Sequence, residues 1–358
     1  MMIMKSNKLK DDSRVLAVGQ AGANVAQMLE RKGYKTYYIN LAVQDLDLVN
    51  SPNKYHIPHG EGASKNRKKA KKVLSESIDE VIDVIDKQIP EHYIFVVYSL
   101  GGGSGSGIGT FLASVIAENP DKHVCLIVIL PSMNESLQAR INAYEALTEI
   151  IEVKNSLGSI FILDNNQRED KLSINRSFAN LFDAFMNVAN YSSIKGVIDI
   201  AEQKTLLETS GVAAIHRITQ GGKEELVSSI NNGIYPKLEG NKKVKYIGLS
   251  QSDNKDVISV EDLKDIVGEG IDTFTGYGNT EETVLYLAGL SMPKTYIDNL
   301  AESIKSEQER VQKILEDDDI KMDKGINFIT SSINNKVEKQ EDKPKTNMRD
   351  RLLAGLNK

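Results

Sequence analysis

One stretch decides the fold of this 358-residue chain: Gly101-Gly102-Gly103-Ser104-Gly105-Ser106-Gly107. A run of β-branched and aromatic residues at 93–98 comes before it, and apolar residues at helical spacing, at 108–117, follow it. This order predicts a strand, a glycine-rich turn and a helix. Glycines let the backbone approach a ligand closely, and the N–H groups of such a turn bind anions. Since Ser104 and Ser106 add hydroxyl donors, the stretch predicts a phosphate-binding loop.

Two other kinds of phosphate loop do not fit this stretch. A Walker loop carries a lysine after its last glycine, where this chain has Ile108. A dinucleotide-binding fold has Gly-x-Gly-x-x-Gly in its first strand-to-helix turn, whereas this run contains that spacing only because it is nearly all glycine. The stretch instead closely resembles the signature loop of the tubulin/FtsZ superfamily of GTPases. The resemblance implies a site for GTP or GDP.

Length and composition predict about two globular domains. With 44 Lys and Arg against 50 Asp and Glu, the net charge of −6 does not suit a general nucleic-acid binder, so any DNA contact should be local. The one cysteine, Cys125, lies in an apolar run and is interpreted as a small buried side chain. A single cysteine excludes a disulfide within the chain, as expected in the cytosol. Residues 1–10 lack the apolar core of a signal peptide, and no run approaches the ~20 apolar residues of a membrane span. We expect a cytoplasmic protein without membrane contact.

Strands and helices alternate along the first half of the chain. Apolar runs at 14–19, 36–40, 93–98, 124–130 and 159–164 are typical of buried strands. The alternation predicts a doubly wound α/β domain with a parallel sheet, whose ligands bind at the carboxyl ends of the strands. The glycine-bearing turns fall at such ends, so one crevice can collect them.

The remainder of the chain predicts a long central helix at about 173–193 and then a smaller α+β domain. Strands are expected near 211–219, 244–249 and 282–289, and helices near 223–231 and 259–267. A charged amphipathic helix and a polar tail without periodicity follow. We divide the chain into a GTP-binding domain (1–172), the central helix (173–196), a second domain (197–293), a C-terminal helix (294–330) and a flexible basic tail (331–358).

A second glycine-bearing turn follows the first strand and reads Gly19-Gln20-Ala21-Gly22-Ala23-Asn24. Its Gly-Gln-x-Gly pattern is similar to the first nucleotide loop of tubulin. The resemblance implies that Gly19, Gln20 and Ala21 contact the nucleotide, with Gln20 near the phosphates and magnesium. It also implies that Asn24 lies near the guanine.

The loop after the second strand departs from the family pattern. It reads Asn40-Leu41-Ala42-Val43-Gln44-Asp45, where FtsZ relatives carry Asn-Thr-Asp-Ala with the aspartate towards the γ-phosphate and the metal. Ala42 stands in place of that aspartate, so no protein ligand of the metal is assigned. Mg²⁺ is expected to be held mainly through the nucleotide phosphates. Asp45 and Asp47 are interpreted as solvated surface carboxylates, and the alternative is that one of them takes the place of the missing aspartate.

A third turn, at 59–63, lies where tubulin relatives place the loop that senses the γ-phosphate. Its candidate nucleotide contacts are Gly60, Gly62 and Ala63. A predicted helix at 64–89 follows, which Ser64 can cap. Its first turns hold six basic residues at 65–72, which we interpret as a solvated helix face.

Two further loops supply candidates for the ribose and the base. Glu135 follows Pro131 at the spacing where FtsZ relatives have a proline and then an acid that contacts the ribose. Asn165 follows the strand at 159–164, where tubulin reads guanine with an asparagine, and an amide group can pair with a purine edge in two directions. An ordinary Asx turn at the end of a strand is the alternative for Asn165.

In tubulin relatives the start of the central helix lies against the base, often with an aromatic residue and an asparagine. Two asparagines compete for that position here. Asn187 has about the family's spacing from Asn165, but it leaves only ~15 Å of helix before the next loop, whereas Asn180 leaves ~25 Å. We select Asn180, with Phe178 or Phe182 stacking on the base. The alternative is that these aromatic residues are simply core.

The loop after the central helix reads Val197-Ile198-Asp199-Ile200-Ala201-Glu202 and resembles the FtsZ sequence Asn-x-Asp-Phe-Ala-Asp. In the family this acidic loop completes the active site of the next subunit. The resemblance implies that Asp199 and Glu202 are catalytic, that subunits stack head to tail, and that the two carboxylates position the water attacking the γ-phosphate. On the residues alone, a solvated helix face is the alternative.

The mixture of tubulin-like and FtsZ-like loops, the charged helix and the basic tail look most like the TubZ branch of the superfamily. That branch comprises plasmid- and phage-encoded GTPases that segregate DNA in bacterial hosts. It implies two partners, namely further copies of the chain and a DNA-binding adaptor on a centromere-like site. The tail would meet the adaptor or DNA through Lys343, Lys345, Arg349, Arg351 and Lys358. An FtsZ-like cell-division GTPase and a non-polymerising dinucleotide-binding enzyme are the alternatives.

Overall fold

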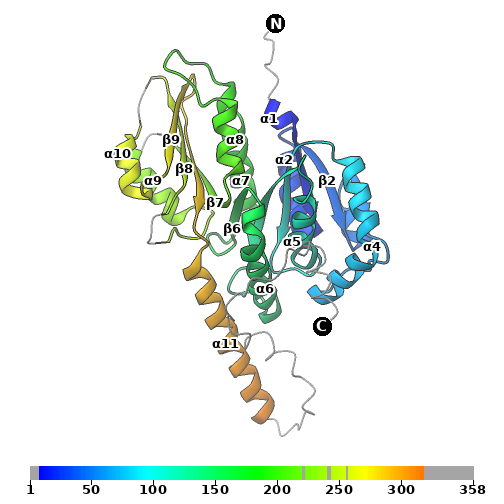
Figure 1. The fold of residues 1–358 in the computed structure, drawn as a ribbon. Coiled ribbons are helices and arrows are strands. Elements are labelled where there is room, and N and C mark those ends of the chain that lie inside the picture. The colour runs from blue at the N-terminus through cyan, green and yellow to red at the C-terminus, as the bar shows by residue number, and fades with distance from the viewer. Residues whose placement is uncertain (1–7, 220–221, 240–242, 255–256, 318–358) are drawn as a thin grey trace, which may run out of the picture.

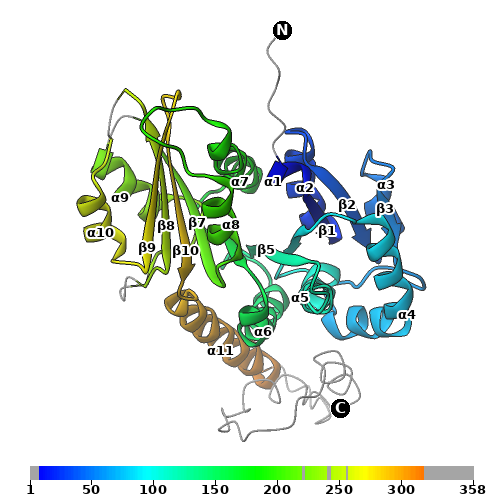
Figure 2. The same ribbon diagram turned by 45° about the horizontal axis from the view of Figure 1, so that its top comes forward.

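The computed structural model describes residues 8–219, 222–239, 243–254 and 257–317. Its centre is a ten-stranded sheet in the order β3-β2-β1-β4-β5-β6-β7-β10-β8-β9, with helices on both faces (Figures 1 and 2). Strands β1 to β6 pair in parallel, as predicted. Their bounds are Ser13–Val18, Lys35–Asn40, Lys54–His56, Tyr93–Ser99, His123–Leu130 and Ser159–Asp164.

The central strands are covered on both faces, which explains why their sequences are continuously apolar. Side chains alternate along β4, so Phe95 and Val97 join one buried cluster while Ile94 and Val96 join the other. The first cluster lies under α2 and α7, and the second lies under α4, α5 and α6. These helices span Gly19–Glu30, Lys171–Met186, Arg67–Gln88, Ser104–Ile116 and Leu137–Val153, and the short turns α1, α3 and η1 span Lys8–Asp11, Val43–Asp47 and Lys154–Ser156.

The second half of the chain extends the same sheet. β6 and β7 pair in parallel over three residues, and β10 runs antiparallel between β7 and β8. The strands β7 to β10 span Gly211–Ile218, Tyr246–Ser252, Asp272–Gly278 and Thr283–Leu290, and the helices α8 to α10 span Ile200–Glu208, Gly222–Asn232 and Val260–Val267. The α/β fold class is confirmed. β3 and β9 were not predicted, because each is an edge strand without a continuous apolar run.

The central helix α7 is shorter than predicted, since it ends at Met186 and not near residue 193. Two contacts fix its end: buried Gln203 donates to the Phe185 carbonyl (2.7 Å), and Asn187 donates its amide to the Asp183 carbonyl (2.7 Å). A 3-10 turn, η2 (Val188–Asn190), follows. The helix-length argument for Asn180 assumed a longer continuous helix and is therefore wrong.

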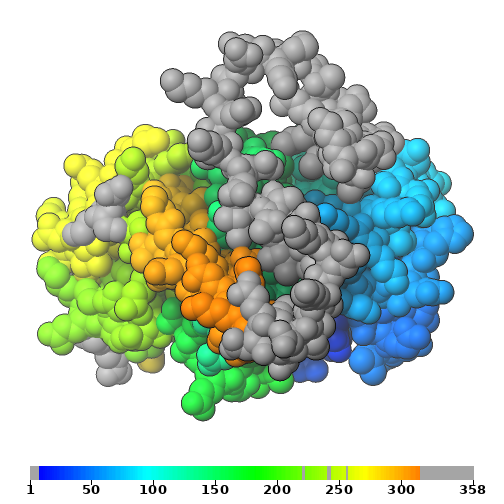
Figure 3. Space-filling view, turned by 90° about the horizontal axis from the view of Figure 1, so that it is seen from below, coloured from blue at the N-terminus to red at the C-terminus, as the bar shows by residue number. Residues whose placement is uncertain are grey.

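The helix α11 (Lys294–Asp317) packs its first turns on α6 through Leu300 and Ile304, which are buried. Figure 3 views this face, with α11 in orange. The expected helical extension to 330 and the basic tail at 331–358 lie outside the described residues. Among the helices that the structure describes, none is long and apolar enough to cross a membrane.

Candidate nucleotide-binding site

A cleft of about 470 Å³ opens beyond the carboxyl ends of β1, β2, β4 and β5. Its size is within the range of small-molecule sites. Loops that are far apart in the sequence line it together. The predicted contacts among the lining residues are Gly19, Gln20, Ala21, Gly62, Ala63, Gly101, Gly102, Gly103, Ser104, Gly105 and Glu135.

Helix α5 begins inside the glycine-rich stretch, at Ser104, and its N-cap Gly103 provides no side-chain cap. The first N–H groups of a helix have no partner within the helix, so they are free to bind an anion. A Cβ atom on Gly102 would meet no atom within 4 Å, so this backbone faces open space. The stretch therefore has the open, donor-rich geometry of a phosphate cradle.

The other loops come close to this stretch through glycine backbones. A Cβ atom on Gly103 would lie 2.7 Å from the Cβ atom of Ala63 and 2.8 Å from the backbone nitrogen of Lys65. Gly19 has φ of 74°, and a Cβ atom there would lie 3.2 Å from the backbone nitrogen of Gly105. A side chain at either glycine would force the three loops apart.

Ser106 and Gly107 do not line the cleft, contrary to prediction. Ser106 is fully buried, and its hydroxyl donates to the Gly102 carbonyl one turn earlier, so it is not available to a phosphate. A Cβ atom on Gly107 would lie 2.8 Å from the Cβ atom of Ala70. This glycine allows α5 to pack closely on α4.

The turn at 59–63 packs against the end of β2. The Gly62 N–H donates to the Leu41 carbonyl (3.0 Å), and a Cβ atom on Gly60 would lie 2.6 Å from the same oxygen. Gly60 is therefore a packing residue outside the lining of the cleft, whereas Gly62 and Ala63 line it.

The two residues after this turn have an uncommon backbone. Ser64 and Lys65 have φ of 46° and 60°, in the left-handed region that non-glycine residues seldom adopt. The following helix is capped by Asn66, whose side chain accepts from the Lys69 N–H (2.9 Å). The predicted cap, Ser64, is wrong, because its left-handed backbone leads into the turn and not into the helix.

The basic stretch at 65–72 is not simply a solvated face, because Arg67 is buried, with 4% of its surface exposed. Its guanidinium donates to the Ser106 carbonyl (2.9 Å) and contacts Glu145 (2.8 Å) and Glu149 (2.7 Å) on α6. One side chain thus ties α4 to the first turns of α5 and to α6.

Ala42 lines the cleft at the position of the missing aspartate, and Asp45 lines it one helical turn later. Asn40 orients both. Its Nδ2 donates to the Asp45 carboxylate (3.0 Å), and its Oδ1 accepts from the Leu41 and Ala42 N–H groups (2.8 and 3.3 Å). Asp45 is therefore a carboxylate of the cleft, whereas Asp47 does not line it, so only one of the two alternatives for the missing aspartate is in place.

The ribose and base candidates differ in their surroundings. Glu135 lines the cleft and accepts from the Lys171 ammonium (2.7 Å) and the Ser132 N–H (3.1 Å). Asn165 has a buried Oδ1 atom without a hydrogen-bond partner in the described part of the chain. Such an acceptor suits the N–H donors of a guanine edge. Asn24 is exposed on α2 and does not line the cleft.

The predicted stacking residue Phe178 is fully buried, and its ring lies 5.4 Å from that of Phe161 and 5.6 Å from that of Phe182. It is a core residue, so it cannot stack on a base. Asn180 is exposed and does not line the cleft, while Asn187 caps the end of α7. The structure therefore supports neither asparagine as a base contact.

The predicted catalytic pair forms a capping box at the start of α8. The Glu202 N–H donates to the Asp199 carboxylate (2.8 Å), and the Asp199 N–H donates to the Glu202 carboxylate (2.9 Å). The last turn of α8 accepts from Ser159 and Tyr93, the first residues of β6 and β4. Gln203, next to Glu202, donates to the Phe185 carbonyl at the end of α7, where Asp183 pairs with Lys10 just before β1. The pair therefore lies at the amino edge of the sheet, opposite the cleft.

A polar residue that sequence analysis missed is Asn142 on α6, with 1% of its surface exposed. Its amide donates to the carbonyls of Lys65 and Gly102. It therefore bridges the glycine-rich stretch and the segment 60–65, which comprises most of the turn at 59–63 and the two residues that follow it. The available signal was a lone asparagine among the apolar residues Ala139, Ala143 and Ala146 on the buried side of a helix.

Two titratable groups away from the cleft, Cys125 and His216, have structural positions. Burial raises the pKa of the Cys125 thiol to about 12. His216 is buried on β7 next to the hydroxyl of Ser229 (2.9 Å), and burial lowers its pKa to about 4. Neither group is poised for chemistry at neutral pH.

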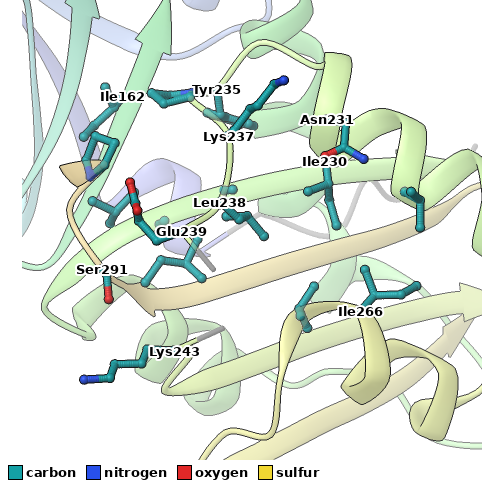
Figure 4. A pocket seen from close by; sticks show the side chains of 18 residues that line it. Ile162, Ile230, Asn231, Tyr235, Lys237, Leu238, Glu239, Lys243, Ile266 and Ser291 are labelled. Carbon is teal, nitrogen blue, oxygen red and sulfur yellow. The ribbon is translucent and has the colours of Figure 1, made fainter. Parts of the chain in front are cut away.

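A second cavity, of about 360 Å³, lies in the second half of the chain (Figure 4). Its walls are largely apolar and include Ile230, Leu238 and Ile266. The Lys237 and Lys243 side chains point in different directions and not to a common point. Because an oriented ligand needs converging polar groups, the cleft at the glycine-rich stretch is the stronger candidate site.

Comparisons with known proteins agree with this geometry. Residues 13–171 match the model of the tubulin/FtsZ family, GTPase domain. The chain is 31% identical over 306 residues to the tubulin-like protein TubZ of Clostridium botulinum C phage, covering 83% of this chain and 84% of that protein. The predicted resemblance is confirmed.

Solved structures show the same fold. The crystal structure of TubZ from Clostridium botulinum phage c-st superimposes with a TM-score of 0.76 at 29% identity, covering 84% of this chain and 99% of that chain. GDP-form protofilaments of TubZ from Bacillus thuringiensis serovar israelensis are built from the same fold, with a TM-score of 0.71 at 18% identity over 85% and 93% of the two chains. The chain therefore belongs to the tubulin/FtsZ family of GTPases.

Proposed function

We propose that the cleft binds the phosphates of GTP and that a second copy of the chain, stacked head to tail, completes the hydrolytic site. The observation that carries this proposal is the separation of the two halves of the site. The cleft lies beyond Ser99, the last residue of β4, whereas the last turn of α8 contacts Tyr93, the first. Gln203, next to Glu202, contacts the end of α7 at the same amino edge of the sheet. A seven-residue strand spans ~23 Å at ~3.3 Å per residue, so Asp199 and Glu202 cannot reach a nucleotide in their own subunit.

Head-to-tail stacking brings the amino edge of one sheet onto the cleft of the next. Such a contact joins two different surfaces and does not close, so it produces a filament. The B. thuringiensis relative with the same fold is described as protofilaments. The exposed position of Asp199 at the start of α8 suits this contact.

We assign to Asp199 and Glu202 the positioning of the water that attacks the γ-phosphate. The capping box holds both carboxylates in fixed positions before the next subunit arrives. In the assembled site they accept hydrogen bonds from the water, while the free N–H groups of the glycine-rich stretch stabilise the charge on the transferring phosphoryl group. Mg²⁺ bound to the phosphates would neutralise further charge, and Asp45, one of the two carboxylates that line the cleft with Glu135, would hold its water shell.

The proposal is tested by measuring GTP hydrolysis against protein concentration together with light scattering. We expect both signals to begin at one threshold concentration. The variants Asp199→Asn and Glu202→Gln keep residues that can form the cap. They therefore remove the two carboxylate charges without removing the cap of the helix. Turnover per assembled subunit should fall at least ~100-fold in the double variant. An unchanged turnover would remove both residues from the site, and hydrolysis without a threshold would contradict assembly.

We further propose that the filaments segregate plasmid or phage DNA through an adaptor. The similarity to a phage TubZ over most of both chains supports this assignment above a cell-division role. Deleting residues 331–358 should abolish co-sedimentation of the filament with its adaptor–DNA complex while GTP hydrolysis and assembly persist. Loss of GTP hydrolysis in the deletion variant would contradict the assignment of this segment to partner binding.

A further inference from the structure

We propose that Asn142 is a positioning residue that sets how strongly the site distinguishes a nucleoside triphosphate from a diphosphate. It does so by holding two walls of the cleft in one arrangement, namely the turn at 60–65 and the glycine-rich stretch. The inference rests on the proposed function, in which the cleft binds nucleotide phosphates.

Every polar atom of the Asn142 side chain is used. Its Nδ2 donates to the carbonyls of Gly102 (2.8 Å), Lys65 (2.9 Å) and Gly101 (3.3 Å). Its Oδ1 accepts from Gln138 one helical turn earlier (2.9 Å), which fixes the orientation of the amide. Since Asn142 is 1% exposed, water does not compete for these bonds.

The turn that Asn142 holds is strained. Ser64 and Lys65 are consecutive non-glycine residues with left-handed backbone, and such residues keep this conformation only where their surroundings impose it. The surroundings here are the bond from Asn142 to the Lys65 carbonyl and the bond from the Lys65 ammonium to the Ser136 hydroxyl (2.9 Å). Without Asn142, the turn loses its buried anchor and relaxes away from the glycine-rich stretch.

The consequence depends on the size of the ligand. A diphosphate held by the N–H groups of the glycine-rich stretch gains little from the position of the opposite wall. An additional terminal phosphate extends towards that wall, where Gly62, Ala63 and Lys65 line the cleft. Fixing the two walls relative to each other therefore favours the triphosphate, because binding gains most when both sets of donors are already in place.

The test compares dissociation constants for GDP and for the slowly hydrolysed analogue GTPγS, measured by fluorescence below the assembly threshold. Asn142→Asp has nearly the same size but no N–H donors, and its carboxylate faces three carbonyl oxygens. We expect GTPγS to bind at least ~10-fold more weakly while GDP affinity changes less than ~3-fold. Thr148→Val, on the exposed side of the same helix, is the matched control and should change neither value.

A second measurement follows the turn itself. Trypsin cleavage after Lys65 in the GTPγS complex should become faster in Asn142→Asp and not in Thr148→Val. If Asn142→Asp does not fold, Gln138→Met, which removes only the bond that orients the amide, should shift both readouts in the same direction by less. Equal weakening of GDP and GTPγS, or an unchanged ratio, overturns the proposal. If the unmodified protein binds neither nucleotide, it is the proposed function that fails.

Discussion

Gly102 and Gly103 are neighbours in the glycine-rich stretch, but they face different surroundings. Gly102 faces the open cleft, so its missing side chain leaves room for a ligand. Gly103 faces Ala63 and Lys65, so its missing side chain leaves room for another loop of the same protein. The sequence shows both as one glycine run, and only the surroundings of each residue separate a binding role from a packing role.

This difference predicts opposite behaviour of two alanine variants. Gly103→Ala should lower the free energy of unfolding of the nucleotide-free protein by about 1–3 kcal/mol, because the new Cβ atom meets backbone within 3 Å. Gly102→Ala should leave that free energy within about 0.5 kcal/mol of the original and weaken GDP binding at least ~10-fold. Urea unfolding and fluorescent GDP titration measure the two effects. If Gly102→Ala bound GDP normally, phosphates would not lie against this residue.

Buried His216 makes stability depend on pH. Burial lowers its pKa to about 4 in the folded protein, against about 6.5 in the unfolded chain. Between these values the unfolded chain takes up a proton that the folded protein does not, so stability is lost as pH falls from about 6.5 towards 4, by up to about 3 kcal/mol. Urea unfolding at pH 7.5, 6 and 5 should show this loss, and His216→Gln should reduce it. An identical pH slope in the variant would contradict the assignment.

At the scale of elements, polar contacts fix how the helices around the cleft meet. Buried Arg67 joins α4 to α5 and α6, and Gln203 of α8 closes the end of α7. The capping box of Asp199 and Glu202 fixes where α8 begins. These contacts position the walls of the cleft at one edge of the sheet and the acidic pair at the other.

Arg67→Ala should destabilise the protein by about 3 kcal/mol, because it leaves the partly buried Glu145 without its cation and Glu149 with Lys71 alone. Lys68→Ala, an exposed neighbour on the same helix, should change stability by less than about 0.5 kcal/mol. Thermal denaturation of the nucleotide-free proteins compares the two. Similar melting temperatures for both variants would show that the Arg67 contacts contribute little.

At the scale of the whole molecule, one continuous sheet carries the cleft at one edge and the acidic pair at the other. Within a single copy, the cleft and the acidic pair are therefore too far apart to meet. Under the proposed function, this arrangement makes hydrolysis a property of the contact between copies, and it provides a test that uses two inactive proteins.

The first inactive protein combines Asp199→Asn with Glu202→Gln and keeps its cleft, and the second carries Gly102→Ala and keeps its acids. Mixed in equal amounts, they should regain GTP hydrolysis, at about a quarter of the original rate per subunit if neighbours pair at random. Phosphate release measured for each protein alone and for the mixture reports this directly. A site contained in one subunit would show no recovery on mixing.

Much of this protein could be predicted from its sequence because the decisive signals are local. Strand and helix order follow from apolar periodicity and glycine-rich turns, and the family follows from Gly101 to Gly107 together with Gly19 to Asn24. Parallel strands then bring the turns to one edge of the sheet. Loops distant in the sequence therefore meet in one cleft, as expected.

What only the tertiary structure decided concerns groups whose surroundings come from distant parts of the chain. Phe178 is in the core because the ring of Phe161 on β6 packs against it. The end of α7 depends on Gln203. The two walls of the cleft are bridged by Asn142, whose partners lie 40 and 77 positions away. Periodicity predicts which face of an element is buried, but it does not predict which polar groups of other elements contact that face.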